Sequence, residues 1–250
     1  MSGHSKWSSI KHKKGAADKK RGQLFSKLSR AIIVAAREGG GDPSANLSLQ
    51  NAIEKAKSYS MPKDNIERAV ARGSGADADA AAYETVIYEG YGSGGVAILV
   101  EALTDNRNRT AADVRAAFAK HDGNLGATGA VAWQFERQGV VFVSGTADED
   151  ELTLAAAEGG AEDVSLDGST YQIVAAPEAL TAVREAVEAA GFTVESWELS
   201  MIPKTTVDVE DEATAKKILR LMDALEENDD VQDVYANFDI PERVLETVAG

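Results

Sequence analysis

The order of predicted strands and helices in residues 139–199 constrains the fold most. Short apolar runs there predict strands, and segments with apolar residues three and four positions apart predict helices. In chain order the elements are strand Val140–Val143, helix 148–158, strands Asp163–Leu166 and Tyr171–Ala175, helix Pro177–Ala190 and strand Thr193–Leu199. This βαββαβ series is the ferredoxin-like arrangement, which forms a complete unit by itself.

Closing that unit leaves a predicted strand, helix and strand near the C-terminus without partners, at Thr205–Val209, Glu212–Glu226 and Val231–Phe238. The segment before the unit holds a hairpin, one helix and a strand at Val131–Phe135. It lacks the further strands and helix that would complete a domain, and the C-terminal elements can supply them. We therefore predict that residues 79–136 and 204–250 form one discontinuous α/β domain, into which a ferredoxin-like domain of residues 137–203 is inserted.

Residues 1–78 are predicted to form a basic tail followed by a compact all-α domain. The first helix carries Leu24 to Ala36 and ends at Gly39–Gly41, and Asp42-Pro43 is predicted to begin the second. The third begins at Met61-Pro62. The fold class is α+β, with a three-helix domain followed by two α/β domains.

Charge is distributed unevenly along the chain. The first 75 of the 250 residues hold fifteen Lys and Arg against six Asp and Glu, a net charge of +9. The remaining residues hold eleven against thirty-five, which gives −24 and a total of −15. Nucleic-acid phosphates would be repelled by the larger part, so we expect the first 75 residues to contact them.

The candidate nucleic-acid-binding residues lie mainly in the tail and on one arc of the first helix, where Trp7 also offers a ring for stacking. A solvated basic face on a core helix is the alternative interpretation of that arc. The candidates in these two segments are Lys6, Trp7, Lys11, His12, Lys13, Lys14, Lys19, Lys20, Arg21, Lys27 and Arg30.

Two further candidates, Arg107 and Arg109, lie in the polar loop Asp105–Thr110. Asp, Asn and Thr suit the turn and cap that lead from a strand into a helix. Two arginines exceed that need, so they either bind phosphate or form an internal salt bridge. The sequence leaves both roles open.

Motifs for catalysis and metal binding are missing. The chain has no cysteine, and none of His4, His12 and His121 has a second ligand at a metal-binding spacing. The acidic runs Asp148–Glu151 and Glu226–Asp230 lack the pattern of a calcium loop, and the second is interpreted as a solvated helix end. We expect no enzyme, cofactor or metal. With neither a signal peptide nor a long apolar run, we expect a cytoplasmic protein that binds no membrane. We also expect a monomer.

Several motifs are spread over almost the whole chain. They are G-H-S-K-W-x-x-I-K-H-x-K at Gly3–Lys14, F-S-K-L at Phe25–Leu28, G-G-G-D-P at Gly39–Pro43, I-Y-E-G-Y-G at Ile87–Gly92, D-N-R-N-R-T at Asp105–Thr110, G-N-L-G at Gly123–Gly126 and S-M-I-P at Ser200–Pro203. Together they resemble the motifs of the YebC family, which includes the mitochondrial translational activator of cytochrome c oxidase. Ser93 departs from the family, which often has proline between the glycines at positions 92 and 94.

The resemblance implies a three-domain fold without catalytic residues, and one of two roles. Family members are described as DNA-binding transcriptional regulators or as ribosome-associated factors that help translation through difficult sequences. The family's basic motif maps onto Lys6, Trp7 and Lys11–Lys14, and its loop onto Asn106, Arg107 and Arg109.

Three hypotheses of function follow. A translation factor would insert its basic head among ribosomal RNA, where stacking and phosphate contacts dominate. A transcriptional regulator would read duplex DNA, although the sequence shows no clear helix-turn-helix or dimerising segment. A pure protein-interaction module would use the acidic domains and leaves the basic head unexplained. The sequence favours the first.

Overall fold

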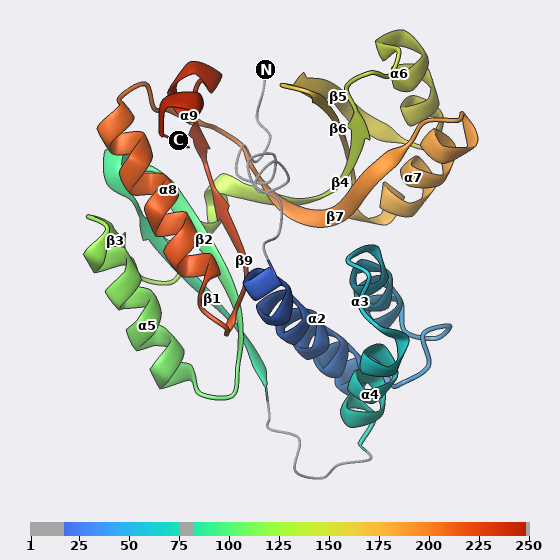
Figure 1. The fold of residues 1–250 in the computed structure, drawn as a ribbon, viewed down its shortest axis with the longest axis horizontal. Coiled ribbons are helices and arrows are strands. Elements are labelled where there is room, and N and C mark those ends of the chain that lie inside the picture. The colour runs from blue at the N-terminus through green and yellow to red at the C-terminus, as the bar shows by residue number, and fades with distance from the viewer. Residues whose placement is uncertain (1–17, 76–82, 249–250) are drawn as a thin grey trace.

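The N-terminal part of the chain folds into three helices. A computed structural model describes residues 18–75 and 83–248, without the side chains of residues 18–21. Helices α2 (Asp18–Gly39), α3 (Leu47–Ser58) and α4 (Lys63–Gly73) pack together (Figure 1). Ile32, Leu49 and Ala56 are fully buried between them. The predicted three-helix arrangement is confirmed.

The start of α3 differs from the prediction at Asp42-Pro43. Asp42 lies in a turn, where its carboxylate accepts hydrogen bonds from the backbone and hydroxyl of Ser44 (2.9 and 2.8 Å). The cap of α3 is Asn46, whose side-chain oxygen accepts from the Leu49 N–H (3.1 Å). Its amide donates to the Ala35 carbonyl (2.7 Å), so one buried side chain begins α3 and fixes it to α2.

The first sheet has the strand order β3-β1-β2-β9. Its strands are β1 (Glu84–Tyr91), β2 (Ala97–Thr104), β3 (Asn124–Leu125) and β9 (Val231–Ala236), and all the pairings are antiparallel. Gly94 and Gly95, both with positive φ, make the 3₁₀ turn η1 (Ser93–Gly95) between β1 and β2.

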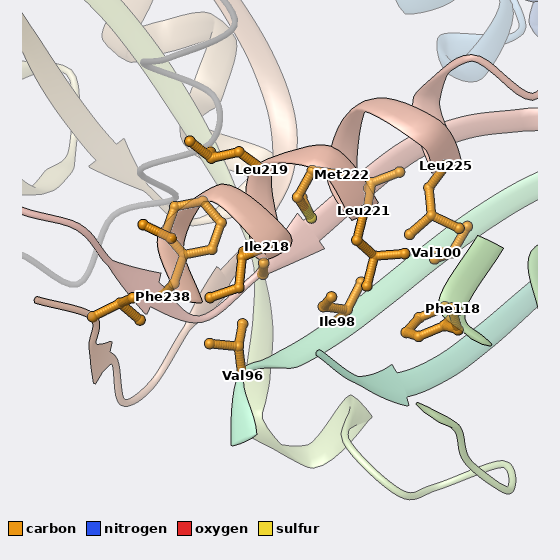
Figure 2. Packing of buried hydrophobic residues seen from close by; sticks show 14 of the residues in the cluster. Val96, Ile98, Val100, Phe118, Ile218, Leu219, Leu221, Met222, Leu225 and Phe238 are labelled. Carbon is orange, nitrogen blue, oxygen red and sulfur yellow. The ribbon is translucent and has the colours of Figure 1, made fainter. Parts of the chain in front are cut away.

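Helices α5 (Arg107–Lys120) and α8 (Glu212–Glu226) cover one face of this sheet (Figure 1). Figure 2 shows Ile98 and Val100 of β2 in the same core as Leu221 and Leu225 of α8. All four side chains are fully buried. Short terminal helix α9 (Glu242–Val248) packs beside α8.

The second sheet has the order β5-β6-β4-β7. This is the strand order of a ferredoxin-like unit, and it confirms the predicted α+β class. Its helices α6 and α7 lie on one face (Figure 1). The elements are β4 (Phe135–Ser144), α6 (Glu149–Glu158), β5 (Ala161–Asp167), β6 (Thr170–Ala175), η3 (Pro177–Ala179), α7 (Leu180–Ala189) and β7 (Val194–Pro203).

Strand β9 follows the second sheet in the chain but belongs to the first, where Ala236 pairs with Ile98 of β2. On this topology we propose the domain division 1–78, 79–136 with 204–250, and 137–203.

Two predicted strands take another form. Residues 131–135 lead through the 3₁₀ turn η2 (Ala132–Gln134) into β4, because the Val131 and Ala132 N–H groups donate to Glu89 instead of a strand partner. The strand predicted at Thr205–Val209 is only β8 (Val207–Asp208). It pairs in parallel with β10 (Phe238–Asp239), outside the first sheet.

Substitution of Gly90 tests the packing of α5 on the first sheet. A Cβ there would lie 2.6 Å from Cε1 of Phe118 and 2.7 Å from the Asn124 carbonyl oxygen. We expect Gly90→Ala to lower the free energy of unfolding by about 2 kcal/mol, the cost of overpacking. Thermal and urea unfolding measure the change.

Gly22→Ala in α2 is the matched control, because a Cβ at that exposed helical position meets no atom within 4 Å. It should stabilise the protein by about 0.5–1 kcal/mol through helix propensity. Equal stability of the Gly90→Ala variant and the unaltered protein would contradict the described packing.

Candidate nucleic-acid interface

Part of the candidate interface lies outside the described residues. This holds for Lys6, Trp7 and the run from Lys11 to Lys14. Lys19, Lys20 and Arg21 belong to α2, but their side chains are not among those described. The described part of the interface therefore begins at Lys27 and Arg30.

Lys27 and Arg30 face the C-terminal end of α8. The Lys27 ammonium donates to the Glu226 carbonyl (2.6 Å), and the Arg30 guanidinium donates to the Asp229 carbonyl. A helix C-terminus presents unpaired carbonyls and a partial negative charge, so it attracts cations. Arg30 also lies over the ring of Tyr83, 5.6 Å from its centroid.

Arg30 and Arg109 converge on the buried carboxylate of Asp230. Arg30 Nη1 lies 3.3 Å from Oδ1, and Arg109 Nη2 lies 2.7 Å from Oδ2. Thr110 donates a third hydrogen bond from its hydroxyl (2.8 Å), and the Thr104 hydroxyl lies 3.4 Å from the same oxygen. We call these five residues the Asp230 junction. It joins α2 to the start of α5 and to the turn between α8 and β9.

The environment of Asp230 explains its ionisation. Burial raises the pKa of Asp230, but the hydrogen bonds from Arg109 and Thr110 and the charges of Arg109 and Arg30 outweigh it, so the pKa lies below its ordinary value. The same contact raises the pKa of Arg109. The interpretation of Glu226–Asp230 as a solvated helix end is therefore wrong at Asp230, whose side chain is only 7% exposed.

The loop Asp105–Thr110 thus serves largely as an internal brace. Asn106 caps α5 by accepting the Arg109 N–H (3.1 Å). Arg109 also pairs with Asp105 (2.9 Å), whereas Arg107 remains exposed, 3.8 Å from Glu84. Of the two roles that the sequence left open, the contacts of Arg109 support the internal one.

Helix α3 contacts both the first sheet and helix α7 of the second, which the sequence did not indicate. Lys55 lies 3.8 Å from Asp233 of β9, and Glu54 lies 3.3 Å from Arg184 of α7. Arg184 also lies over the ring of Trp197, 4.6 Å from its centroid. Both cations meet residues distant in the chain, so no local pattern could have revealed them.

The other basic side chains that the structure describes in the three helices are exposed, at Arg37, Lys57, Lys63, Arg68 and Arg72. Lys63 pairs with Glu67 on its own helix (3.5 Å), and Arg68 contacts Asn65. These contacts are local and exposed, so they cost little to exchange for a phosphate.

Two family models cover most of the chain. One, described as the TACO1/YebC protein N-terminal domain, matches residues 5–76. The other, described as the TACO1/YebC second and third domain, matches residues 83–238. The chain belongs to the TACO1/YebC family. The resemblance seen in the sequence motifs is confirmed.

Relatives of this TACO1/YebC member match along its whole length. A protein of Rubrobacter xylanophilus named "probable transcriptional regulatory protein" is 60% identical and covered in full, as is this chain. One of Halothermothrix orenii with the same name is 52% identical over 99% of both chains. The crystal structure of the conserved hypothetical protein Aq1575 from Aquifex aeolicus superposes with a TM-score of 0.82 at 50% identity, covering 90% of this chain and 93% of that one.

The described residues of this TACO1/YebC member include neither a cluster of metal ligands nor a membrane-spanning helix. No group of three or more His, Asp or Glu side chains there is placed to hold a metal ion. None of the described helices is long and apolar enough to cross a membrane.

Replacing Asp230 by Asn tests the junction. The substitution leaves the guanidinium groups of Arg30 and Arg109, which are 19% and 48% exposed, without their carboxylate. Loss of hydrogen bonds to a charged group typically costs about 2 kcal/mol, and we expect Asp230→Asn to lower the free energy of unfolding, measured in urea, by about that amount. Glu227→Gln, which removes an exposed acid from the same turn, is the matched control and should change stability by less than about 0.5 kcal/mol. Similar effects of the two variants would contradict the junction.

The low pKa of Asp230 makes this contribution depend on pH. A carboxylate whose pKa is lower in the folded state stabilises fully above its ordinary value of 3.8, and the stabilisation is lost as pH falls through the folded value. The stability gap between the unaltered protein and Asp230→Asn should thus be largest near neutral pH and shrink below about pH 4. Urea unfolding across pH 3–7 measures the gap, and a gap independent of pH would contradict the assignment.

Proposed function

We propose that this protein is a non-enzymatic regulator of gene expression that binds nucleic acid through its N-terminal tail and helices. The separation of charge supports the proposal most, since residues 1–75 carry +9 and the remainder −24. A phosphate backbone is attracted by the first segment and repelled by the second.

The contacts of the described residues divide the candidates into two groups. Lys27 contacts the last residue of α8, and Arg30 and Arg109 contact Asp230 in the turn that follows it. We propose that these three orient α2, and that phosphates are contacted from residues upstream of them. The upstream group is Lys6, Trp7, Lys11, His12, Lys13, Lys14, Lys19, Lys20 and Arg21. Arg107, exposed at the start of α5, stays a further candidate for a phosphate contact.

The favoured form of this function is a cytoplasmic translation factor that binds ribosomal RNA and helps to relieve stalled translation. Lysines, histidines and one tryptophan in a short segment suit an irregular RNA surface, where stacking and phosphate contacts dominate. In this mechanism, binding energy stabilises a productive arrangement of the ribosome, and the protein itself makes or breaks no bond.

A DNA-binding transcriptional regulator is the second candidate. The names of the relatives from Rubrobacter and Halothermothrix favour it. The two candidates differ in their nucleic acid, so RNA recovered after crosslinking in cells would support the first and promoter DNA the second.

Charge removal from the tail tests the proposed interface. We expect the triple variant Lys11→Ala, Lys13→Ala, Lys14→Ala to bind ribosomes more weakly in co-sedimentation. The slope of log affinity against log salt for a single-stranded RNA should fall by about 2, since each lost phosphate contact removes about 0.7.

The matched control removes the same charge from exposed positions on α5 and α8, with Arg115, Lys120 and Lys216 changed to Ala. It should bind as the unaltered protein does. Undiminished binding by the tail variant at low salt, or an equal loss in the control, would refute the role given to the tail.

A further inference from the structure

Two exposed aromatic side chains lie side by side on the first α/β domain. Trp133 of η2 is 69% exposed and Tyr91 at the end of β1 is 37% exposed. Both donate to one acceptor, the Ala130 carbonyl, from the indole Nε1–H (3.2 Å) and the phenol hydroxyl (3.1 Å). The shared acceptor places the polar edges of the two rings next to each other. We call this pair the aromatic platform.

The backbone beneath the platform is held by one buried side chain. The carboxylate of Glu89, which is 4% exposed, accepts hydrogen bonds from the N–H groups of Gly129 (2.6 Å), Val131 (2.7 Å) and Ala132 (2.7 Å). The Glu89 carbonyl also accepts the Gly126 N–H (2.7 Å). Charged hydrogen bonds of this length fix a loop firmly, so Trp133 is presented on a rigid support.

Exposing an indole in a fixed position forgoes the free energy of burying it. Burial was possible close by, because Val131 and Phe135, two residues to either side of Trp133, are 0% and 4% exposed. Since the polar edges of both rings are already bonded to Ala130, the platform offers ring faces to a partner. Stacking needs only a ring face, whereas capture of a peptide backbone would use a free donor.

The backbone of Lys204 lies next to that of the platform. Its N–H donates to the carbonyl of Gln134, the neighbour of Trp133 (2.8 Å), and the Lys204 side chain is exposed. A stacking ring and a lysine close to it in the fold suit one nucleotide of a single strand, with the base on the ring and the phosphate on the ammonium group.

We infer that Trp133 and Tyr91 form a stacking site for unpaired bases of a single-stranded nucleic acid, with Lys204 as a local phosphate contact. Base stacking provides the binding at this site, because residues 76–250 as a whole carry −24 and repel a phosphate backbone. The inference rests on the proposed function, to which it adds a second contact point and a preference for unpaired strands. Because stacking accepts any base, the site takes single strands without reading their sequence.

Strands with and without bases test the inference. Affinity is measured for a twelve-nucleotide uridine strand and for an abasic strand of equal length, which keeps the phosphates. We expect Trp133→Ala to bind the uridine strand about tenfold more weakly and the abasic strand unchanged, because each stacked base contributes a factor of this order. Trp133→Phe retains a ring and should recover most of the affinity.

Lys204→Ala should weaken both strands alike, since it removes a phosphate contact. Leu154→Ala is the matched control, because Leu154 is 64% exposed on α6 in the other α/β domain, and it should bind both strands as the unaltered protein does. Thermal unfolding checks that each variant is folded.

Tryptophan fluorescence detects stacking on Trp133 directly, and a purely structural role of this residue would produce no quenching. Stacked bases quench an indole, so the uridine strand should quench the unaltered protein more than the Trp133→Phe variant. Equal quenching in the two would overturn the site, because the signal would then come from Trp7 or Trp197.

The remaining outcomes separate this inference from the proposed function. Failure of the unaltered protein to bind any nucleic acid would overturn both. Binding of the uridine strand that Trp133→Ala leaves unchanged would overturn the stacking site alone. A proline-rich peptide is the last probe. If Trp133→Ala abolishes peptide binding but leaves strand binding unchanged, the platform is a peptide site and the stacking site is overturned.

Discussion

The carboxylate of Asp230 attaches the N-terminal helices to the first sheet. It carries a full charge in a buried position, a state that is costly unless the charge is paired and hydrogen-bonded. Two arginines from separate elements and two threonine hydroxyls meet that requirement. One residue in the turn after α8 therefore links the orientation of α2 to the start of α5.

This attachment changes how the basic residues are to be understood. A helical wheel groups Lys27 and Arg30 with the other cations of the first helix, and on charge alone they are equivalent. The structure distinguishes them, because the end of α8 supplies carbonyls and carboxylates to Lys27 and Arg30. The cations thus fall into two groups. Lys27 and Arg30 join α2 to the end of α8, and the cations upstream of them are the ones that we assign to phosphates.

The sequence predicted those elements whose formation depends on neighbours in the chain. Helix α8 has its predicted bounds, and the βαββαβ order of residues 139–199 is found in the second sheet. It failed where a distant side chain decides the backbone, as at residues 131–135, where Glu89 accepts the N–H of a residue 43 positions later. It also missed the role of Asp230, because Arg30 lies 200 positions before it and no periodic pattern spans that distance. The apolar run at residues 131–135 suggested a strand, whereas the Glu89 contact makes a turn there and leaves Trp133 exposed.

The late position of β9 in the chain bears on how the protein is made. Strand β2 lies inside the finished sheet, yet one of its edges receives its partner only when residues 231–236 arrive, after the whole ferredoxin-like unit. While the chain grows, that edge presents unpaired N–H and C=O groups together with the apolar side chains of Ile98 and Val100. A nascent chain stopped before β9 therefore holds a complete second sheet and a first sheet whose β2 edge is open to strand pairing with another chain, so the arrival of residues 231–236 protects that edge from aggregation.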